Sequence, residues 1–120
     1  MEFSIIRREA ATRHCYTLAQ GSGWSEFDFL YDWVGSNRNG ELCKLNSESI
    51  AELITMASMQ VKENEEKGQF LCDNDLHFSG GEIVTASAFI LFLSSVESYA
   101  DLRREFIKGD DSEYFICVEW

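Results

Sequence analysis

The most regular hydrophobic pattern lies in the middle of the chain, where apolar residues recur every three or four positions between Ser49 and Lys67. This period is that of one face of an amphipathic helix. Ser49 and Glu52 have the spacing of an N-terminal capping box, and Gly68 is a natural stop. The pattern therefore predicts a helix from about Ser49 to Lys67. Its inward face is expected to consist of Ile50, Leu53, Ile54, Ala57 and Val61.

A second segment, from Gly81 to Val96, is apolar on nearly every side. A helix without a polar face belongs in the interior of a domain, so we expect this helix to be central and buried. The segment Ser98–Lys108 predicts another helix, which Gly109 ends. The residues that these two helices are expected to place in the core are Ile83, Phe89, Ile90, Leu93, Leu102, Phe106 and Ile107.

The segment Trp24–Val34 is dense in aromatic residues, and one set of them recurs at helical spacing. Ser25 is a candidate N-cap for this helix. Phe29 and Trp33 fall off the regular stripe, so they are expected at the surface. The stripe expected in the core consists of Trp24, Phe27, Tyr31 and Val34.

Short runs rich in β-branched and aromatic residues predict strands at Phe3–Ile6, Glu41–Leu45 and Glu113–Trp120. The segment Glu9–Gln20 has little apolar weight and is expected to be helical. Because the chain has no linker and no internal repeat, its 120 residues predict one domain, 1–120. The expected fold class is α+β, a mostly helical single domain with a buried central helix and a few short strands.

The excess of acidic over basic residues limits the kinds of molecule that this chain is expected to bind. The chain has 21 acidic residues against 10 basic ones, a formal net charge of −11. Such a field attracts basic proteins and repels nucleic acids and anionic membranes. We therefore expect a basic protein partner, without direct binding of nucleic acid or membrane. Solubility alone is the competing explanation of the acidity.

The cysteines and the start of the chain bear on location. Cys15, Cys43, Cys72 and Cys117 are widely spaced and form no CxxC pair. The first residues, MEFSIIRREA, lack the uninterrupted apolar stretch of a secretory signal. No stretch approaches the roughly 18 apolar residues of a membrane span. These features predict a cytoplasmic protein with reduced thiols.

Catalytic chemistry has one local candidate, the segment 72–77, which brings Cys72 and His77 close in sequence. Nucleophilic catalysis needs a base and a third group that orients it. A polar loop with one buried cysteine is the commoner arrangement. His14 and Cys15 are not a better candidate for a catalytic pair, because neighbouring residues on a helix do not face each other. We therefore expect no enzyme activity and no catalytic residues.

No metal and no cofactor are expected either. Structural zinc uses close pairs of Cys or His ligands, and only Cys72 and His77 approach that spacing. The acidic segment 73–75 begins like a calcium loop, but the glycine and the closing glutamate of such a loop are missing. The paired glycines before the apolar helix resemble a phosphate cradle, but no lysine or arginine lies nearby in the sequence.

Acidic residues gather in three places, and one of these also contains an aromatic anchor. The pairs Asp28 with Asp32 and Glu48 with Glu52 share helical faces and would do acid–base chemistry only if buried, so we interpret them as solvated. Trp33 beside Asp28 and Asp32 combines an aromatic ring with an acidic rim, as protein-binding surfaces do. The residues predicted to bind a partner are Asp28, Asp32, Trp33, Asp73, Asp75, Asp110, Asp111 and Glu113.

In its small size, its acidity and its lack of an active-site motif, the chain is similar to bacterial immunity proteins, which neutralise a partner toxin, often a basic nuclease, by covering it. The resemblance involves no sequence motif and transfers no residue roles. It implies an acidic inhibitor that occludes the active site or the substrate surface of its toxin.

Three alternatives stay open. A phage-type inhibitor that mimics nucleic acid would need a regular row of carboxylates. A non-catalytic adaptor subunit would be favoured by large exposed apolar patches. A small enzyme that uses Cys72 and His77 is the least favoured of the three.

Overall fold

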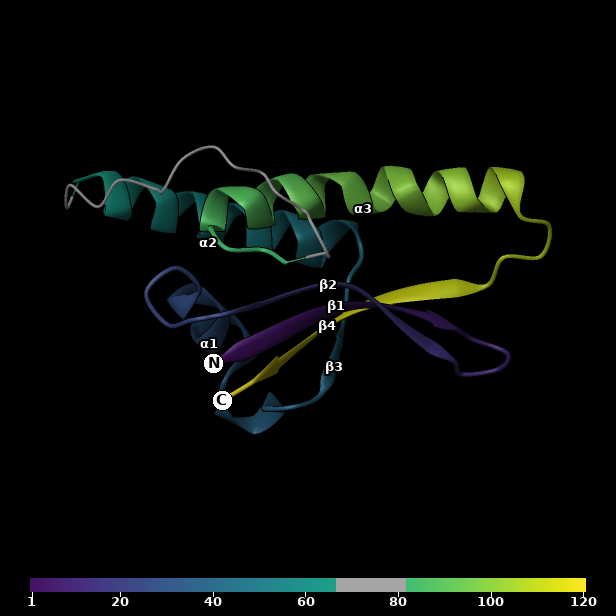
Figure 1. Ribbon diagram of the computed structural model, residues 1–120, viewed down its shortest axis with the longest axis horizontal. Coiled ribbons are helices and arrows are strands. Elements are labelled where there is room, and N and C mark those ends of the chain that lie inside the picture. The colour runs from purple at the N-terminus through teal and green to yellow at the C-terminus, as the bar shows by residue number, and fades with distance from the viewer. Residues whose placement is uncertain (67–81) are drawn as a thin grey trace.

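The first and last strands of the chain lie side by side at the centre of a four-stranded antiparallel sheet, and two long helices cover one face of it (Figure 1). The computed structural model describes residues 1–66 and 82–120. The strands are β1 Glu2–Glu9, β2 Cys15–Ser22, β3 Leu42–Lys44 and β4 Ser112–Glu119, in the spatial order β2-β1-β4-β3. The helices are α1 Asp28–Val34, α2 Ser47–Glu66 and α3 Ala86–Phe106, with a short 3₁₀ turn at Ser36–Arg38.

The two central strands turn one face toward the helices. In β1 the buried side chains alternate along the strand at Phe3, Ile5 and Arg7, as expected where a sheet is covered on one side. In β4, Val118 lies opposite Phe3, and Ile116 lies opposite Ile5. These cross-strand pairs form the floor of the hydrophobic core.

α2 packs on the sheet through the apolar face that its sequence predicts, with Leu53 and Ala57 fully buried. Its start differs from the prediction. The N–H of Ser49 donates to Oδ1 of Asn46 and the N–H of Asn46 donates to Oγ of Ser49, both at 2.9 Å. Asn46 is therefore the cap, and Ser49 is its reciprocal partner in the first turn.

α3 is one helix of 21 residues, whereas the sequence predicted two. Oγ1 of Thr85 caps it by accepting a hydrogen bond from the N–H of Ala88 at 3.0 Å. The face toward the sheet runs through Phe89, Leu93 and Ala100 at helical spacing, and all three are buried. The helix is continuous because no breaking residue separates the two expected segments.

The expected burial of the C-terminal part of α3 is wrong. Leu102, Phe106 and Ile107 are all exposed, and the exposed fraction reaches 78% for Phe106. After Ala100 the helical period brings Arg103, not Leu102, to the side of the sheet. None of the described helices is both long enough and apolar enough to cross a membrane.

The α+β class fits the structure, but the expected mostly helical balance with a few short strands is wrong. Three of the four strands have eight residues each. The segment Glu9–Gln20, expected to be a helix, contains the turn of a hairpin and most of β2. A weakly patterned segment becomes a strand when a neighbouring strand offers it a partner, which β1 does here. The expected central helix corresponds to α3, which is buried only on the face toward the sheet.

For three aromatic residues in and next to α1, the expected burial is wrong. The helix begins after Phe27, and no side chain caps it, so Ser25 is not its cap. Phe27 is buried as expected, but Phe29 is buried too, whereas Trp24 and Tyr31 are exposed. Trp24 precedes the helix and therefore does not follow its period.

The cysteines that the structure describes are unpaired. Cys15 is exposed, Cys43 is buried and Cys117 is half-buried. Burial raises the pKa of the thiols of Cys43 and Cys117. Cys72 lies outside the described residues.

Candidate protein-binding surface

Trp33 belongs to α1, and its side chain contacts α2 and is held in one orientation. Its Nε1 donates a hydrogen bond to Oε2 of Glu52 at 3.2 Å. The guanidinium carbon of Arg38 lies 5.2 Å from the centre of the indole ring, and Nη2 of Arg38 donates to the carbonyl oxygen of Trp33 at 2.8 Å. The half-buried ring is therefore fixed while part of it stays accessible, as a preorganised anchor requires.

A shallow groove opens beside this indole ring, and we refer to it as the Trp33 groove. It is lined by Trp33, Glu48, Ala51, Glu52, Thr55 and Met56. The five residues of α2 recur at helical spacing; Met56 is partly buried against the core, and the other four are exposed. The indole and Met56 make the interior of the groove apolar, and the carboxylates of Glu48 and Glu52 make its rim acidic.

The acidic rim carries charge that the described part of the chain does not neutralise. Glu48 and Glu52 lie four positions apart on α2, where like charges repel. Asp28 and Asp32 lie on the exposed side of α1. The carboxylates of Glu48, Asp28 and Asp32 make no hydrogen bond or ion pair with any described residue. A cation from another molecule would relieve this repulsion.

Glu113 and Asp111, two of the predicted partner-binding residues, are engaged in contacts within the chain. The carboxylate of Glu113 lies on the outer face of the sheet, 3.8 Å from Nη2 of Arg8 and 3.6 Å from Nζ of Lys44. Oδ2 of Asp111 accepts a hydrogen bond from the N–H of Ala11 at 2.9 Å, which ties the start of β4 to the turn of the hairpin. Both side chains stabilise the fold where they are.

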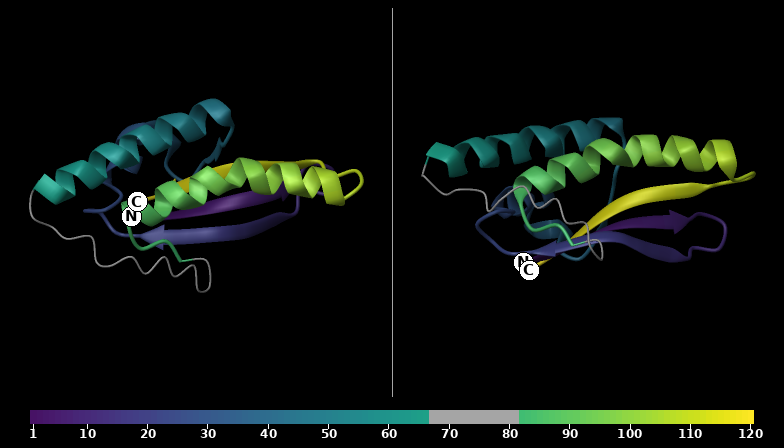
Figure 2. Two further views of the ribbon diagram at one scale, coloured as in Figure 1. Left: turned by 90° about the horizontal axis from the view of Figure 1, so that it is seen from above. Right: turned by 45° about the horizontal axis from the view of Figure 1, so that its top comes forward.

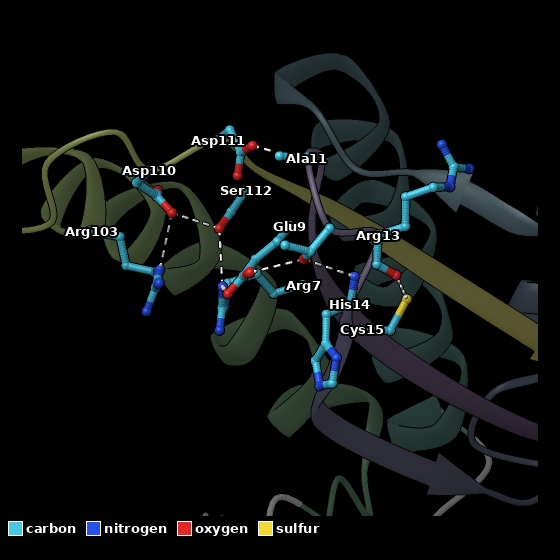
Figure 3. A network of polar contacts seen from close by, with 11 residues as sticks. Arg7, Glu9, Ala11, Arg13, His14, Cys15, Arg103, Asp110, Asp111 and Ser112 are labelled. Carbon is cyan, nitrogen blue, oxygen red and sulfur yellow. Dashed lines mark hydrogen bonds and ion pairs between the residues drawn. The ribbon is translucent and has the colours of Figure 1, made fainter.

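The side chain of Asp110 is only 5% exposed, and it lies between Arg103 and Ser112 (Figure 3). Its Oδ1 accepts a hydrogen bond from Oγ of Ser112 at 2.6 Å and lies 3.6 Å from Nε of Arg103. The hydrogen bond from Ser112, together with the charge of Arg103, holds the pKa of Asp110 below its usual range. Oγ of Ser112 also accepts from Nη1 of Arg7 at 3.1 Å, so the network links α3, β4 and β1. These contacts point to a structural role for Asp110.

The structure brings Asp28, Asp32 and Trp33 together on one short helix. The segment 110–113 lies at the opposite end of the molecule, where α3 passes into β4 (Figure 1). Asp73 and Asp75 lie outside the described residues, as do Cys72, His77 and the paired glycines. The described acidic clusters therefore do not form a single binding surface.

Sequence reasoning did not assign Ala51, Thr55 and Met56 to a site, and it treated Glu48 and Glu52 only as a solvated pair. The sequence held one indication that these residues could form a site. Ala51, Thr55 and Met56 fall outside the apolar face predicted for the helix, although Met56 is partly buried against the core. That Trp33 packs beside them depends on the tertiary structure.

In the described residues no group of three or more His, Cys, Asp or Glu side chains is placed to hold a metal ion. Comparison of the chain with protein-family models, with curated proteins and with solved structures gives no match. Function is therefore inferred from the chemistry of the surface itself.

Proposed function

We propose that this protein is an acidic inhibitor of the immunity-protein type, which binds a basic protein partner through the Trp33 groove. The observation that supports the proposal is a fixed aromatic ring beside two carboxylates, those of Glu48 and Glu52, that have no cationic partner among the described residues. The ring supplies a large contact area at little entropic cost, and the rim supplies steering and register. The partner is a nuclease-type toxin, because such an enzyme must expose a cationic surface to its nucleic acid.

Inhibition of this kind needs no chemistry on the partner. An arginine or lysine of the partner between Glu48 and Glu52 relieves their repulsion, while an adjoining apolar side chain packs against Trp33 and Met56. The net charge of −11 raises the rate of encounter with a basic protein. A toxin covered at its cationic groove is then unable to take up its substrate.

Growth rescue tests the proposal. Cells that express a basic nuclease encoded by a neighbouring gene should grow when the wild-type protein is co-expressed, and the complex should persist through gel filtration. The triple variant Trp33→Ala, Glu48→Gln and Glu52→Gln should lose both properties.

The matched control is the double variant Glu97→Gln and Glu105→Gln. It also removes two negative charges, but from exposed positions on α3 that lie away from the groove. Rescue by the control and not by the groove variant supports the proposal. Rescue that survives in the groove variant, or that both variants lose equally, contradicts it.

A non-catalytic adaptor subunit is the second candidate, and the exposed apolar end of α3 favours it. Leu102, Phe106 and Ile107 lie together at the end of that helix and are exposed. Apolar patches of this kind mark contacts with other proteins. If the adaptor function holds, the double variant Leu102→Gln and Phe106→Ser abolishes binding of the natural partner, and the groove variant leaves it intact.

A further inference from the structure

Arg7 and Tyr114 are neighbours on the inner face of the sheet, where they lie directly opposite each other on β1 and β4. Figure 2 shows α3 lying across these two strands. Arg7 is only 7% exposed and Tyr114 only 6%. Nε of Arg7 and Oη of Tyr114 are buried, and they have no hydrogen-bond partner among the described residues. The elements packed around both donors, β1, β2, β4 and α3, are described over their whole length.

A buried donor without an acceptor carries a free-energy cost, and the cost is larger for a charged group. The guanidinium of Arg7 stays charged when it is buried. Its Nη1 donates to Oγ of Ser112 at 3.1 Å and lies 3.7 Å from Oε1 of Glu9, but neither contact involves Nε. An acceptor oxygen from another molecule, placed beside Nε of Arg7 and Oη of Tyr114, would therefore lower the free energy of the folded chain.

The two carboxylates of this polar network are already engaged elsewhere. Oδ1 of Asp110 accepts a hydrogen bond from Oγ of Ser112 at 2.6 Å. Oε2 of Glu9 accepts one from Oγ1 of Thr12 at 3.1 Å, in the turn of the hairpin. Neither carboxylate therefore supplies the acceptor that the two buried donors lack.

Arg103 brings a second guanidinium to the same place. Its Nε lies 3.6 Å from Oδ1 of Asp110 but forms no hydrogen bond. Figure 3 shows the guanidinium groups of Arg7 and Arg103 pointing the same way. Burial raises the pKa of Tyr114, and the charges of Arg103 and Arg7 both act against that rise, so the three side chains share one electrostatic environment. The two arginines balance the two carboxylates of the network, and an anion is therefore not repelled here as it is by the acidic chain as a whole.

A hollow of about 320 Å³ beside Tyr114 gives a small ion access and room. It opens between the start of α2 and the second half of α3, and it is lined by Tyr114 together with Ala100, which has no side-chain atom beyond Cβ. Of the carboxylates in its lining, that of Asp101 is paired with Arg104, and that of Glu97 is exposed to solvent. The volume is at the lower end of the range for ligand sites, about 300–1,000 Å³. The hollow therefore suits a small ion rather than a large cofactor.

We propose that Arg7 and Tyr114 bind a small oxyanion, a carboxylate or a phosphate group, which accepts hydrogen bonds from Nε of Arg7 and Oη of Tyr114. The Cβ atoms of directly opposite residues on antiparallel strands lie about 4.5–5.5 Å apart, so one oxyanion spans the two donors. Its hydrogen bond with arginine is charge-assisted and hence stronger than one between neutral groups. Arg103 adds positive charge at the edge of the site, where its side chain is partly exposed. The site shares no residue with the Trp33 groove and does not rest on the proposed function.

Isothermal titration calorimetry on the full chain tests the proposal, with inorganic phosphate and sodium acetate as separate probes in a Tris chloride buffer of constant ionic strength. The wild type should bind one ion per chain. Tyr114→Phe and Arg7→Lys should each weaken binding about tenfold, since each removes one hydrogen bond to a charged ligand. Tyr16→Phe is the control, because it removes an exposed hydroxyl beside Arg7, and it should bind like the wild type. The ion that binds more tightly shows whether the natural ligand offers a phosphate or a carboxylate.

Thermal unfolding gives a second measurement, which separates binding from folding. Without the ion, Tyr114→Phe should be at least as stable as the wild type, because the hydroxyl that it removes is buried and has no partner among the described residues. The same concentration of the ion should raise the melting temperature of the wild type more than that of Tyr114→Phe. The proposal is overturned if the wild type binds neither ion, or if Tyr114→Phe binds as tightly as the wild type. A Tyr114→Phe chain that is less stable than the wild type without the ion overturns it as well.

Discussion

Nε1 of Trp33 donates a hydrogen bond to Oε2 of Glu52 at 3.2 Å and thereby joins α1 to α2. Trp33→Phe keeps an aromatic ring in the space and removes the donor. We expect the free energy of unfolding to fall by about 0.5–1.5 kcal/mol, the usual net contribution of one such bond. Urea unfolding followed by circular dichroism measures the change. Glu52→Gln, which retains an acceptor oxygen, should cost less than Trp33→Phe, and the opposite order would contradict the assigned bond.

Association with the natural partner should depend on salt. Screening shortens the range of the acidic field, so the association rate constant should fall as ionic strength rises to about 0.5 M. Asp28→Asn with Asp32→Asn should slow association more than it speeds dissociation, because exposed charges outside the groove act mainly on the rate of encounter. Surface plasmon resonance separates the two rates. An association rate that does not change with salt would assign the acidity to solubility alone.

Gly21 in β2 leaves space for two neighbours. A Cβ at this position would lie 2.5 Å from Cε1 of Phe3 and 2.6 Å from the carbonyl oxygen of Ile83. Gly21→Ala should lower the free energy of unfolding by about 1–3 kcal/mol, because ring and backbone must both move. The exposed neighbour gives the control: Ser22→Ala should change stability by less than about 0.5 kcal/mol. Equal effects of the two substitutions would show that the close approach does not limit stability.

The lowered pKa of Asp110 links stability to acid pH. A carboxyl whose pKa is lower in the folded chain than in the unfolded chain contributes stability above the unfolded value, near pH 4, and loses it as pH falls through the folded value. Asp110→Asn should therefore reduce stability at pH 7 and flatten the loss of stability between about pH 5 and pH 2. Unfolding at a series of pH values measures both effects.

Glu105→Gln is the control for that pH series, since Glu105 is exposed and lies near the end of the same helix, α3. Its stability profile should run parallel to that of the wild type. If the stability profile of Asp110→Asn also runs parallel to that of the wild type, then Ser112 and Arg103 do not hold the carboxylate of Asp110 in its charged form.

The sequence alone was sufficient where an element has its own period and its own boundaries. The apolar face of α2, with Leu53 and Ala57 inward, could be predicted because a helix that buries one stripe must repeat every three to four residues. The aromatic and β-branched run that ends the chain likewise identified β4. The surface position of Asp28 and Asp32 followed from the same local spacing.

The tertiary structure decided what depends on residues distant in the chain. The segment Glu9–Gln20 became a turn and a strand because β1 was available as a partner, which its own weak pattern does not record. Asp28 and Asp110 are the same residue type with opposite surroundings, one exposed and one paired with Arg103 and Ser112. Helical and strand periods are local properties of a sequence, whereas strand pairing and the loss of water from a carboxylate depend on which distant segments pack together.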